Sequence, residues 1–297
     1  MKQSSPPQSP RGIDHLVLAG ANLDALADFY ARLGFQVGPR NRHPWGTENH
    51  IIQFDGAFLE LIGVGRGAAI AERAGRAYSF GAFVRDFCQG GEGLAMLALD
   101  SRNAVGDAEA FRQARIGTFD PFHFEREGRD AAGQPKVVSF SLAFAEMHNA
   151  PRAGFFTCQQ HKPQNFWAAE KQVHANGVTA IAEVVMVDDD PADHHEFLGA
   201  FIGQRVMRSV SGALEIETAR GRLTVLSPAA FRFRFGVAPP LKAGAGPQFA
   251  AVTFRCVRGQ AMAARLATVA PCALQHGGML VLPGTNAHGV VLAFAES

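Results

Sequence analysis

Apolar residues recur along the chain in short strand-like runs, separated by helical stretches and polar turns. The first set begins with Ile13–Ala19, an apolar run that predicts a buried strand. Asn22 can then cap a helix that continues to Leu33. Three more strands are predicted after this helix: Phe35–Val37, Glu48–Phe54 and Ala57–Val64. The order of elements in this first module is therefore β-α-β-β-β.

The same order of elements returns three more times. The second copy runs over Gly93–Gln160, and the third begins with Val178–Val187. The fourth follows the Gly/Pro-rich segment Ala238–Pro247, which predicts a flexible boundary. Between modules we expect a partly helical stretch over Ala68–Phe87 and a helix over Gln164–Asn176. Four copies of one unit are typical of a fold assembled from internal repeats.

One β-α-β-β-β module cannot cover its own sheet. Two modules side by side can form a curved sheet with helices outside and a cup inside, and a cup is where small-molecule pockets usually lie. We therefore predict the α+β class, with four βαβββ modules paired into two cup-shaped, mixed-sheet half-barrel domains. Residues 13–177 form the first domain and residues 178–297, with shorter and degenerate modules, form the second. Residues 1–12 are polar and proline-rich and predict a disordered tail.

Charge and cysteine usage narrow the class of function. The chain of 297 residues has 28 basic and 27 acidic side chains, so no basic surface for nucleic acid or anionic membrane is expected. No apolar run is long enough to span a bilayer. Four separated cysteines without a C-x-x-C pair favour a reducing, cytoplasmic location. A small-molecule ligand is the expected partner, and strand edges that pair between subunits make a homodimer a further expectation.

Two ionisable residues lie inside apolar strands of the first module. His15 interrupts the first strand and Glu60 interrupts the last. Burial of such groups is costly unless they are hydrogen-bonded, paired or bound to a metal. Imidazole and carboxylate can hold a divalent ion such as zinc, manganese, iron or nickel. Glu60 also suits a general base. The alternative is a hydrogen-bonded His–Glu pair without metal.

A third metal ligand would have to come from another part of the chain. Strand alternation allows Gln159 or His161 to enter the same cup, as could His50 from the third strand. We assign His161 as a candidate metal ligand and Gln159 and His50 as candidate ligand-binding residues. The alternative without a binding role is that His161 only ends the strand. Cys158 is predicted to be a small buried hydrophobic residue.

The polar segment Arg42–His50 lies between two strands and predicts a pocket rim. Trp45 can stack on a ring, while His43 and Asn49 can bind oxygen atoms. The alternative is an ordinary hairpin loop with its turn at Gly46. No organic cofactor is expected, because the chain has no P-loop and no dinucleotide fingerprint after a strand.

Several motifs together resemble a known family. They are Asp14–Ala19, Leu33-Gly34-Phe35, Arg42-His43-Pro44 followed by Gly46–Asn49, and Phe58–Ile62. The sequence resembles glyoxalase-like domain proteins of the vicinal-oxygen-chelate superfamily, which includes glyoxalases, bleomycin-resistance proteins and extradiol dioxygenases. The resemblance implies paired modules, a divalent metal in many members, and reactions on substrates with neighbouring oxygens. It implies fold more firmly than reaction, because some members only bind antibiotics.

In that family the metal ligands lie on the first and fourth strands of each module. His15 and Glu60 match these positions, but the second module has Met96 near one position and no Glu in its last strand. Glu183 lies near the first-strand position of the third module. The function expected is therefore a metal-dependent lyase, isomerase or dioxygenase that uses the first cup. The alternatives are a non-catalytic binder of aromatic or antibiotic-like molecules, and a degenerate relative with neither activity.

Overall fold

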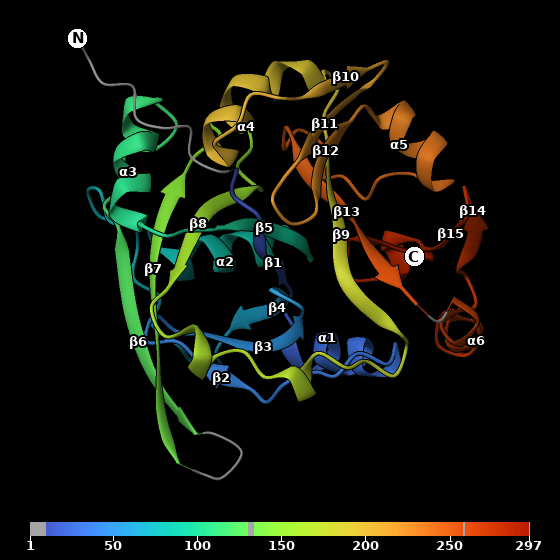
Figure 1. The fold of residues 1–297 in the computed structure, drawn as a ribbon, viewed down its shortest axis with the longest axis horizontal. Helices are drawn as coiled ribbons and strands as arrows, with labels where there is room; N and C mark the ends of the chain where they lie inside the picture. The colour runs from blue at the N-terminus through green and yellow to red at the C-terminus, as the bar shows by residue number, and fades with distance from the viewer. Residues whose placement is uncertain (1–9, 130–133, 258, 297) are drawn as a thin grey trace.

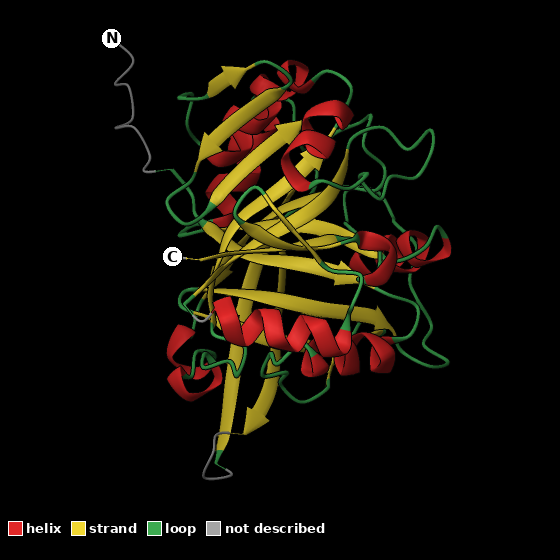
Figure 2. Cartoon of the chain, turned by 90° about the vertical axis from the view of Figure 1, so that its right-hand side faces the viewer, coloured by secondary structure: helices red, strands yellow, loops and turns green. Residues whose placement is uncertain are grey.

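Strands from the first 160 residues form one curved sheet in the computed structural model, which describes residues 10–129, 134–257 and 259–296. The strand order is β2-β3-β4-β1-β5-β8-β7-β6 (Figure 1). Its strands are β1 (Ile13–Ala19), β2 (Asn41–Arg42), β3 (Thr47–Phe54), β4 (Ala57–Val64), β5 (Gly93–Asp100), β6 (Phe122–Arg129), β7 (Pro135–Ala145) and β8 (Gly154–Gln160). Figure 2 shows β6 and β7 as a long hairpin that projects beyond the body of the molecule.

A second eight-stranded sheet repeats this order as β10-β11-β12-β9-β13-β16-β15-β14. Its strands are β9 (Val178–Val187), β10 (Arg208–Val210), β11 (Ala213–Glu217), β12 (Arg222–Leu226), β13 (Gln248–Cys256), β14 (Leu274–His276), β15 (Met279–Leu282) and β16 (Val291–Glu296). In both sheets two antiparallel strands lie at the centre, and each has a parallel neighbour outside it. The predicted α+β class with two cup-shaped, mixed-sheet domains is confirmed.

One hydrophobic core joins the two sheets behind their cups. Phe155 on β8 packs against Phe249 on β13 and against Phe201 on α4, with ring centroids 5.3 Å apart in both pairs. Of the six α-helices in the described ranges, four contribute buried residues to this core. They are α1 (Leu23–Arg32), α3 (Ala104–Gln113), α4 (His195–Ile202) and α6 (Gly259–Val269). The two cups are therefore packed together through their outer faces.

The remaining two helices, α2 (Phe80–Gln89) and α5 (Pro228–Phe235), pack into the cups themselves. Ser79 caps α2 by accepting a hydrogen bond from the Ala82 N–H, and Ser227 caps α5 in the same way from Ala230. Part of α2 lies within the predicted partly helical stretch Ala68–Phe87, whereas α5 was not predicted. Both helices narrow the space that a bare cup would enclose.

Two local predictions are wrong. Gln164–Asn176 is not a helix and contains only the short 3-10 turns Pro163–Asn165 and Ala169–Lys171. Backbone groups of this segment instead hydrogen-bond to the side chain of Gln53. The Gln53 amide donates to the Phe166 carbonyl and accepts from the Ala168 N–H. The second strand forms at Asn41–Arg42 and not at Phe35–Val37.

The predicted tail of residues 1–12 is ordered at its end. Arg11 is buried, pairs with Asp107 at 2.6 Å and donates to the Phe201 carbonyl at 2.7 Å. Its backbone N–H also bonds the carbonyl of Ile202. Residues 1–9 of that prediction lie outside the described residues. Within the described ranges, no helix combines the length and apolarity needed to cross a membrane.

The segment that links the two sheets is held by a buried histidine. His174 accepts a hydrogen bond from the Gln36 N–H at Nδ1 and bonds the Gln53 carbonyl through Nε2, both at 3.0 Å. Phe35 and Phe54 flank its ring. Burial lowers the pKa of His174 below its usual range, against the opposing effect of the Gln53 carbonyl. The folded state therefore favours the neutral ring.

The pH dependence of stability follows from this histidine. In the unfolded chain this histidine binds a proton at the ordinary pKa of about 6.5. In the folded state it binds a proton only at lower pH, so the free energy of unfolding falls as pH drops through about 6.5. His174→Gln should lose about 1–3 kcal/mol of unfolding free energy near pH 8, because hydrogen bonds and ring packing are lost. Its stability should also decline less between about pH 8 and about pH 5.5 than that of the wild type.

Urea denaturation at the two pH values measures both effects. His148→Gln, at an exposed position, is the matched control and should follow the wild type. Equal acid-induced loss of stability in wild type and His174→Gln would contradict this role for the histidine.

Candidate functional site

The first cup encloses a small cavity between its sheet and α2, which we call the N-terminal cavity. Its volume is about 50 Å³, room for a few water molecules or a few ligand atoms. Aromatic rings and a smaller number of polar groups form its wall. The lining residues are His15, His43, Trp45, Asn49, Ile51, Phe58, Glu60, Phe80, Phe124, Arg126, Phe140, Leu142, Phe156, Cys158 and Phe166.

Strand register brings His15 and Glu60 to the same face of the sheet. In the parallel pair β1–β4, His15 lies beside Phe58, and Val17 lies beside Glu60. Residues two apart on a strand face the same way, so both ionisable side chains enter the cup. They are 5% and 6% exposed, which makes an unpartnered charge at either position costly.

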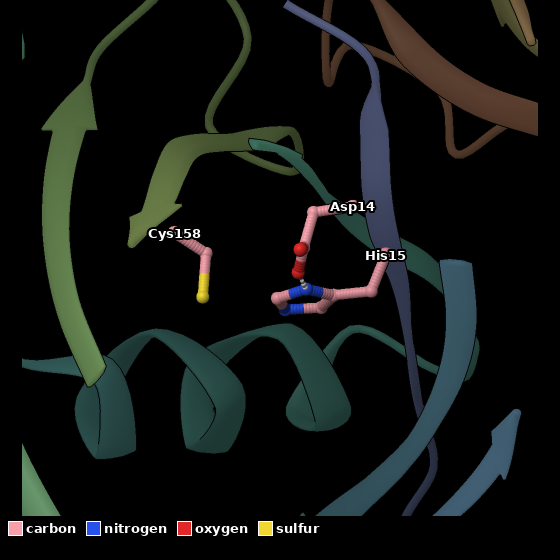
Figure 3. A group of neighbouring side chains, drawn as sticks. All are labelled: Asp14, His15 and Cys158. Atoms are coloured by element: carbon pink, nitrogen blue, oxygen red, sulfur yellow. Dashed lines mark hydrogen bonds and ion pairs between the residues drawn. The ribbon is translucent and has the colours of Figure 1, made fainter. Parts of the chain in front are cut away.

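His15 is held by its neighbour Asp14, because β1 carries a bulge at this point. Ile13 pairs with Leu99 of β5, and His15 pairs with the adjacent residue Ala98. Asp14 has no partner on β5 and is the extra residue of the bulge. A bulge re-aims side chains, and here Asp14 turns toward the same side as His15. Figure 3 shows the Asp14 carboxylate at His15 Nδ1, with Oδ1 at 2.5 Å.

Asp14 is itself held from across the cup. Gln160 on β8 donates its amide N–H to Asp14 Oδ2 at 2.8 Å. Because a carboxylate accepts hydrogen bonds, Nδ1 of His15 carries the proton that it shares with Asp14. The His15 ring stacks on Phe58 with a centroid distance of 4.1 Å, and its Nε2 has no hydrogen-bond partner in the described part of the chain.

Glu60 has a separate set of partners. Asn49 donates its side-chain amide to Glu60 Oε1, and His43 Nε2 lies 3.9 Å from the same oxygen. Asn41 donates to Asn49 Oδ1 at 3.1 Å, which orients the Asn49 amide. Glu60 Oε2 has no hydrogen-bond partner within the described ranges. One carboxylate oxygen is therefore anchored and the other is available.

His43 lies deep in the rim and is neutral at physiological pH. Burial lowers its pKa to about 4, although Glu60 opposes this shift. Its ring stacks on Trp45 with centroids 4.4 Å apart, and Nδ1 bonds Thr47 Oγ1 at 2.8 Å. The Trp45 indole N–H is buried and lacks a hydrogen-bond partner among the described residues. This donor is therefore unsatisfied, and the ring of Trp45, not its N–H, faces the cavity.

Cys158 completes a cluster that sequence analysis did not recognise. Its Sγ, a carboxylate oxygen of Asp14 and a ring nitrogen of His15 all lie within 4.8 Å of one another (Figure 3). Burial raises the pKa of the Cys158 thiol, and the charges of Asp14 and Glu60 raise it further. No local pattern in the sequence reveals the bulge that aims Asp14 at this cluster.

Arg126 was also not singled out, because its strand reads as an exposed hairpin. Its guanidinium donates to Asn41 Oδ1 at 2.5 Å from the wall of the N-terminal cavity. Burial lowers the pKa of Arg126, while Glu60 acts in the opposite direction. The cavity therefore has one cationic wall.

Three predicted site residues are not brought to the cavity. His50 points to the other face of β3 and bonds the Gly38 carbonyl at 2.8 Å. Gln159 accepts from the Ala104 N–H at the start of α3, and His161 bonds Ser141 Oγ at 2.8 Å near the surface. The alternation of β8 runs opposite to that expected, because Cys158 and Gln160 face the cup. His43, Trp45 and Asn49 do lie at the cavity, together with His15 and Glu60.

The second cup contains a different polar centre. Glu183 stands four residues before the end of β9, as His15 does in β1. It accepts hydrogen bonds from Thr224 and Thr253 and pairs with Arg234 of α5 at 2.6 Å. Phe231 and Phe235 of the same helix fill the cup around it. Glu183 is thus fully engaged by protein groups.

Comparisons with known proteins place this geometry in a family. The model of the family described as "Glyoxalase-like domain" matches residues 13–202. No curated protein matches the sequence.

Three solved structures share the fold. A hypothetical protein from Staphylococcus aureus is 11% identical with a TM-score of 0.64, covering 97% of this chain and 100% of that one. A mutant 4-hydroxymandelate synthase from Streptomyces coelicolor is 11% identical with a TM-score of 0.56, covering 97% and 93%. A Mn(II)-bound glyoxalase from Novosphingobium aromaticivorans is 11% identical with a TM-score of 0.50, covering 97% and 82%. The chain belongs to the glyoxalase-like domain family, within the vicinal-oxygen-chelate superfamily.

Proposed function

We propose that the protein is an enzyme that acts on a small oxygenated organic compound, with a divalent metal ion held in the N-terminal cavity by His15, Glu60 and Cys158. The observation that carries this proposal is the Asp14–His15 pair, which leaves Nε2 of a buried imidazole without a protein partner. The similarity in fold to a Mn(II)-bound glyoxalase supports the use of a metal.

The arrangement around His15 fits a metal ligand. A histidine that binds metal almost always donates its other ring N–H to a carboxylate or carbonyl, which sets the tautomer and the ring orientation. Asp14 fills this role at Nδ1, and Gln160 holds Asp14 in turn. Nε2 makes no hydrogen bond to the described residues, and His15 lines the N-terminal cavity, so this nitrogen could bind a metal there.

The donor set also indicates which metal would bind best. His15 would supply nitrogen, Cys158 would supply sulfur, and Glu60 would supply Oε1, which keeps a second lone pair beside the Asn49 amide and leaves Oε2 uncoordinated. Three protein ligands with an open position are typical of catalytic zinc sites, and a soft thiolate favours zinc over manganese. Cys158 replaces His161 in this set, because His161 lies outside the cavity.

The remaining groups at the cavity would bind and orient the substrate. The Trp45 ring could stack on a substrate, and Asn49 holds the Glu60 carboxylate by donating to Oε1. When bound, the metal would polarise the substrate oxygens. Glu60 Oε2 is the candidate to take up a proton next to them.

The alternative is a protein that binds an aromatic molecule without reaction. The observation that favours it is the wall, in which seven of the fifteen lining side chains are Phe or Trp. Both functions predict ligand binding in the N-terminal cavity, but only the enzyme requires metal and Glu60.

Metal binding by His15 is the first test. The wild type should bind about one zinc ion, and His15→Ala should bind it at least about 100-fold more weakly, because a direct ligand is lost. Asp14→Asn should weaken binding about 10- to 100-fold, since it acts on the ligand and not on the metal. Competition titration against a chelator dye measures these affinities. His148→Ala is the control, and unchanged affinity in His15→Ala would contradict the proposal.

The thiolate ligand has its own spectroscopic test. Cobalt(II) bound at the site should give a near-ultraviolet sulfur-to-metal charge-transfer band, because a thiolate is coordinated. Cys158→Ser should remove this band, and Cys88→Ser, on α2, should retain it. A band that persists in Cys158→Ser would remove that cysteine from the ligand set and leave His15 and Glu60 in place.

Glu60 separates the enzyme from the binder. We would screen metal-loaded protein against compounds with two neighbouring oxygens (α-hydroxycarbonyls, α-keto acids and catechols), using thermal shift first and turnover second. For a compound that is turned over, Glu60→Gln should lower kcat about 100- to 10,000-fold, because a positioned base is removed. Ligands that stabilise the wild type without turnover would support the binder instead.

A further inference from the structure

A second hollow lies beside the N-terminal cavity, and we call it the outer hollow. Its volume is about 430 Å³, and it is open to solvent between the linker and the β6–β7 hairpin. Ile51, Arg126 and Phe166 line both spaces, so the two are neighbours across these three side chains. A ligand in the outer hollow would therefore lie next to the wall of the N-terminal cavity.

The outer hollow has a charge that the chain as a whole lacks. Arg126, Lys136 and Lys171 all line it, and none of its described lining residues is Asp or Glu. No ion pair ties any of these three cations to a carboxylate in the part of the chain that the structure describes. The chain carries a formal charge of only +1, so this is a local concentration of positive charge.

A concave surface lined by one sign of charge focuses the electrostatic potential and attracts the opposite sign. Arg126 lies at the junction of the two hollows with its guanidinium bonded to the neutral Asn41 amide. A guanidinium held this way keeps donors free for a carboxylate, sulfonate or phosphate.

The volumes of the two spaces limit which part of a ligand can bind in each. The N-terminal cavity, at about 50 Å³, admits only a few non-hydrogen atoms, whereas the outer hollow is about 430 Å³. The bulk of any drug-sized ligand must therefore lie outside, against the cations. We infer that the substrate is an organic anion whose acidic group binds among Arg126, Lys136 and Lys171, while its small oxygenated end enters the N-terminal cavity. This inference rests on the proposed function, because it assigns the substrate class of the same site.

A pair of dyes with the same ring system tests the charge requirement. The probes are 8-anilinonaphthalene-1-sulfonate, an anion, and N-phenyl-1-naphthylamine, which lacks the sulfonate. The anion should bind the wild type at least about tenfold more tightly by fluorescence titration, because two or three nearby cations attract it. Its affinity should fall as salt is raised from about 0.02 to about 0.5 M, since screening weakens charge attraction.

Variants locate the effect in the outer hollow. The double variant Lys136→Gln/Lys171→Gln, and separately Arg126→Gln, should weaken binding of the anion about tenfold and leave the neutral dye unchanged. Arg66→Gln/Arg205→Gln removes the same number of charges at exposed positions outside the hollow and is the matched control. Equal binding of the two dyes, no binding of the anion, or equal loss in the control pair would each overturn the inference.

The outcome can be told apart from failure of the proposed function. The dye titrations are run on metal-free and zinc-loaded protein, and the cobalt charge-transfer band is recorded for each variant. Loss of metal binding in the wild type would count against the enzyme and leave the dye comparison valid. An intact cobalt band with no preference for the anion would overturn only the substrate class.

Discussion

The first cup depends on a buried imidazole that needs a partner on each side. At Nδ1 the partner is Asp14, which reaches His15 only because β1 carries a one-residue bulge. Without the bulge, Asp14 would face the hydrophobic core behind the sheet, where a carboxylate would be strongly unfavourable. The bulge therefore gives both Asp14 and His15 a hydrogen-bond partner, and it leaves His15 lining the N-terminal cavity with Nε2 unpartnered among the described residues.

A comparison of the two cups shows how the partners of a buried polar group decide whether it is available to a ligand. Both have the same strand order and a helix packed inside, yet the second cup pairs Glu183 with Arg234 and two threonines. A buried carboxylate with an ion pair and several hydrogen bonds has little left for a ligand. In the first cup the helix that occupies the equivalent space, α2, contributes only apolar side chains such as Phe80 to the wall, and the polar groups remain available.

The repeated order of strands and helices could be predicted from the sequence. Predictions failed where a single tertiary contact overrides the local sequence pattern. The four modules, and the entry of His15 and Glu60 into one cup, followed from strand order and alternation. The alternation of β8 could not be assigned from Phe155–His161, because apolar residues occupy both faces of that strand. Likewise the helix expected over Gln164–Asn176 is absent, since the distant Gln53 takes the backbone groups that a helix would use.

Charge balance supports the proposal that a metal would bind in this cavity together with the Cys158 thiolate. Asp14 and Glu60 bring two carboxylates, Arg126 brings one guanidinium, and His43 is neutral because burial lowers its pKa to about 4. These groups leave one net negative charge in an apolar wall. A divalent ion alone would reverse that sign, whereas one that also displaces the proton of Cys158 brings the total to zero. Since burial penalises any uncompensated charge, the pair of changes is more favourable than either alone.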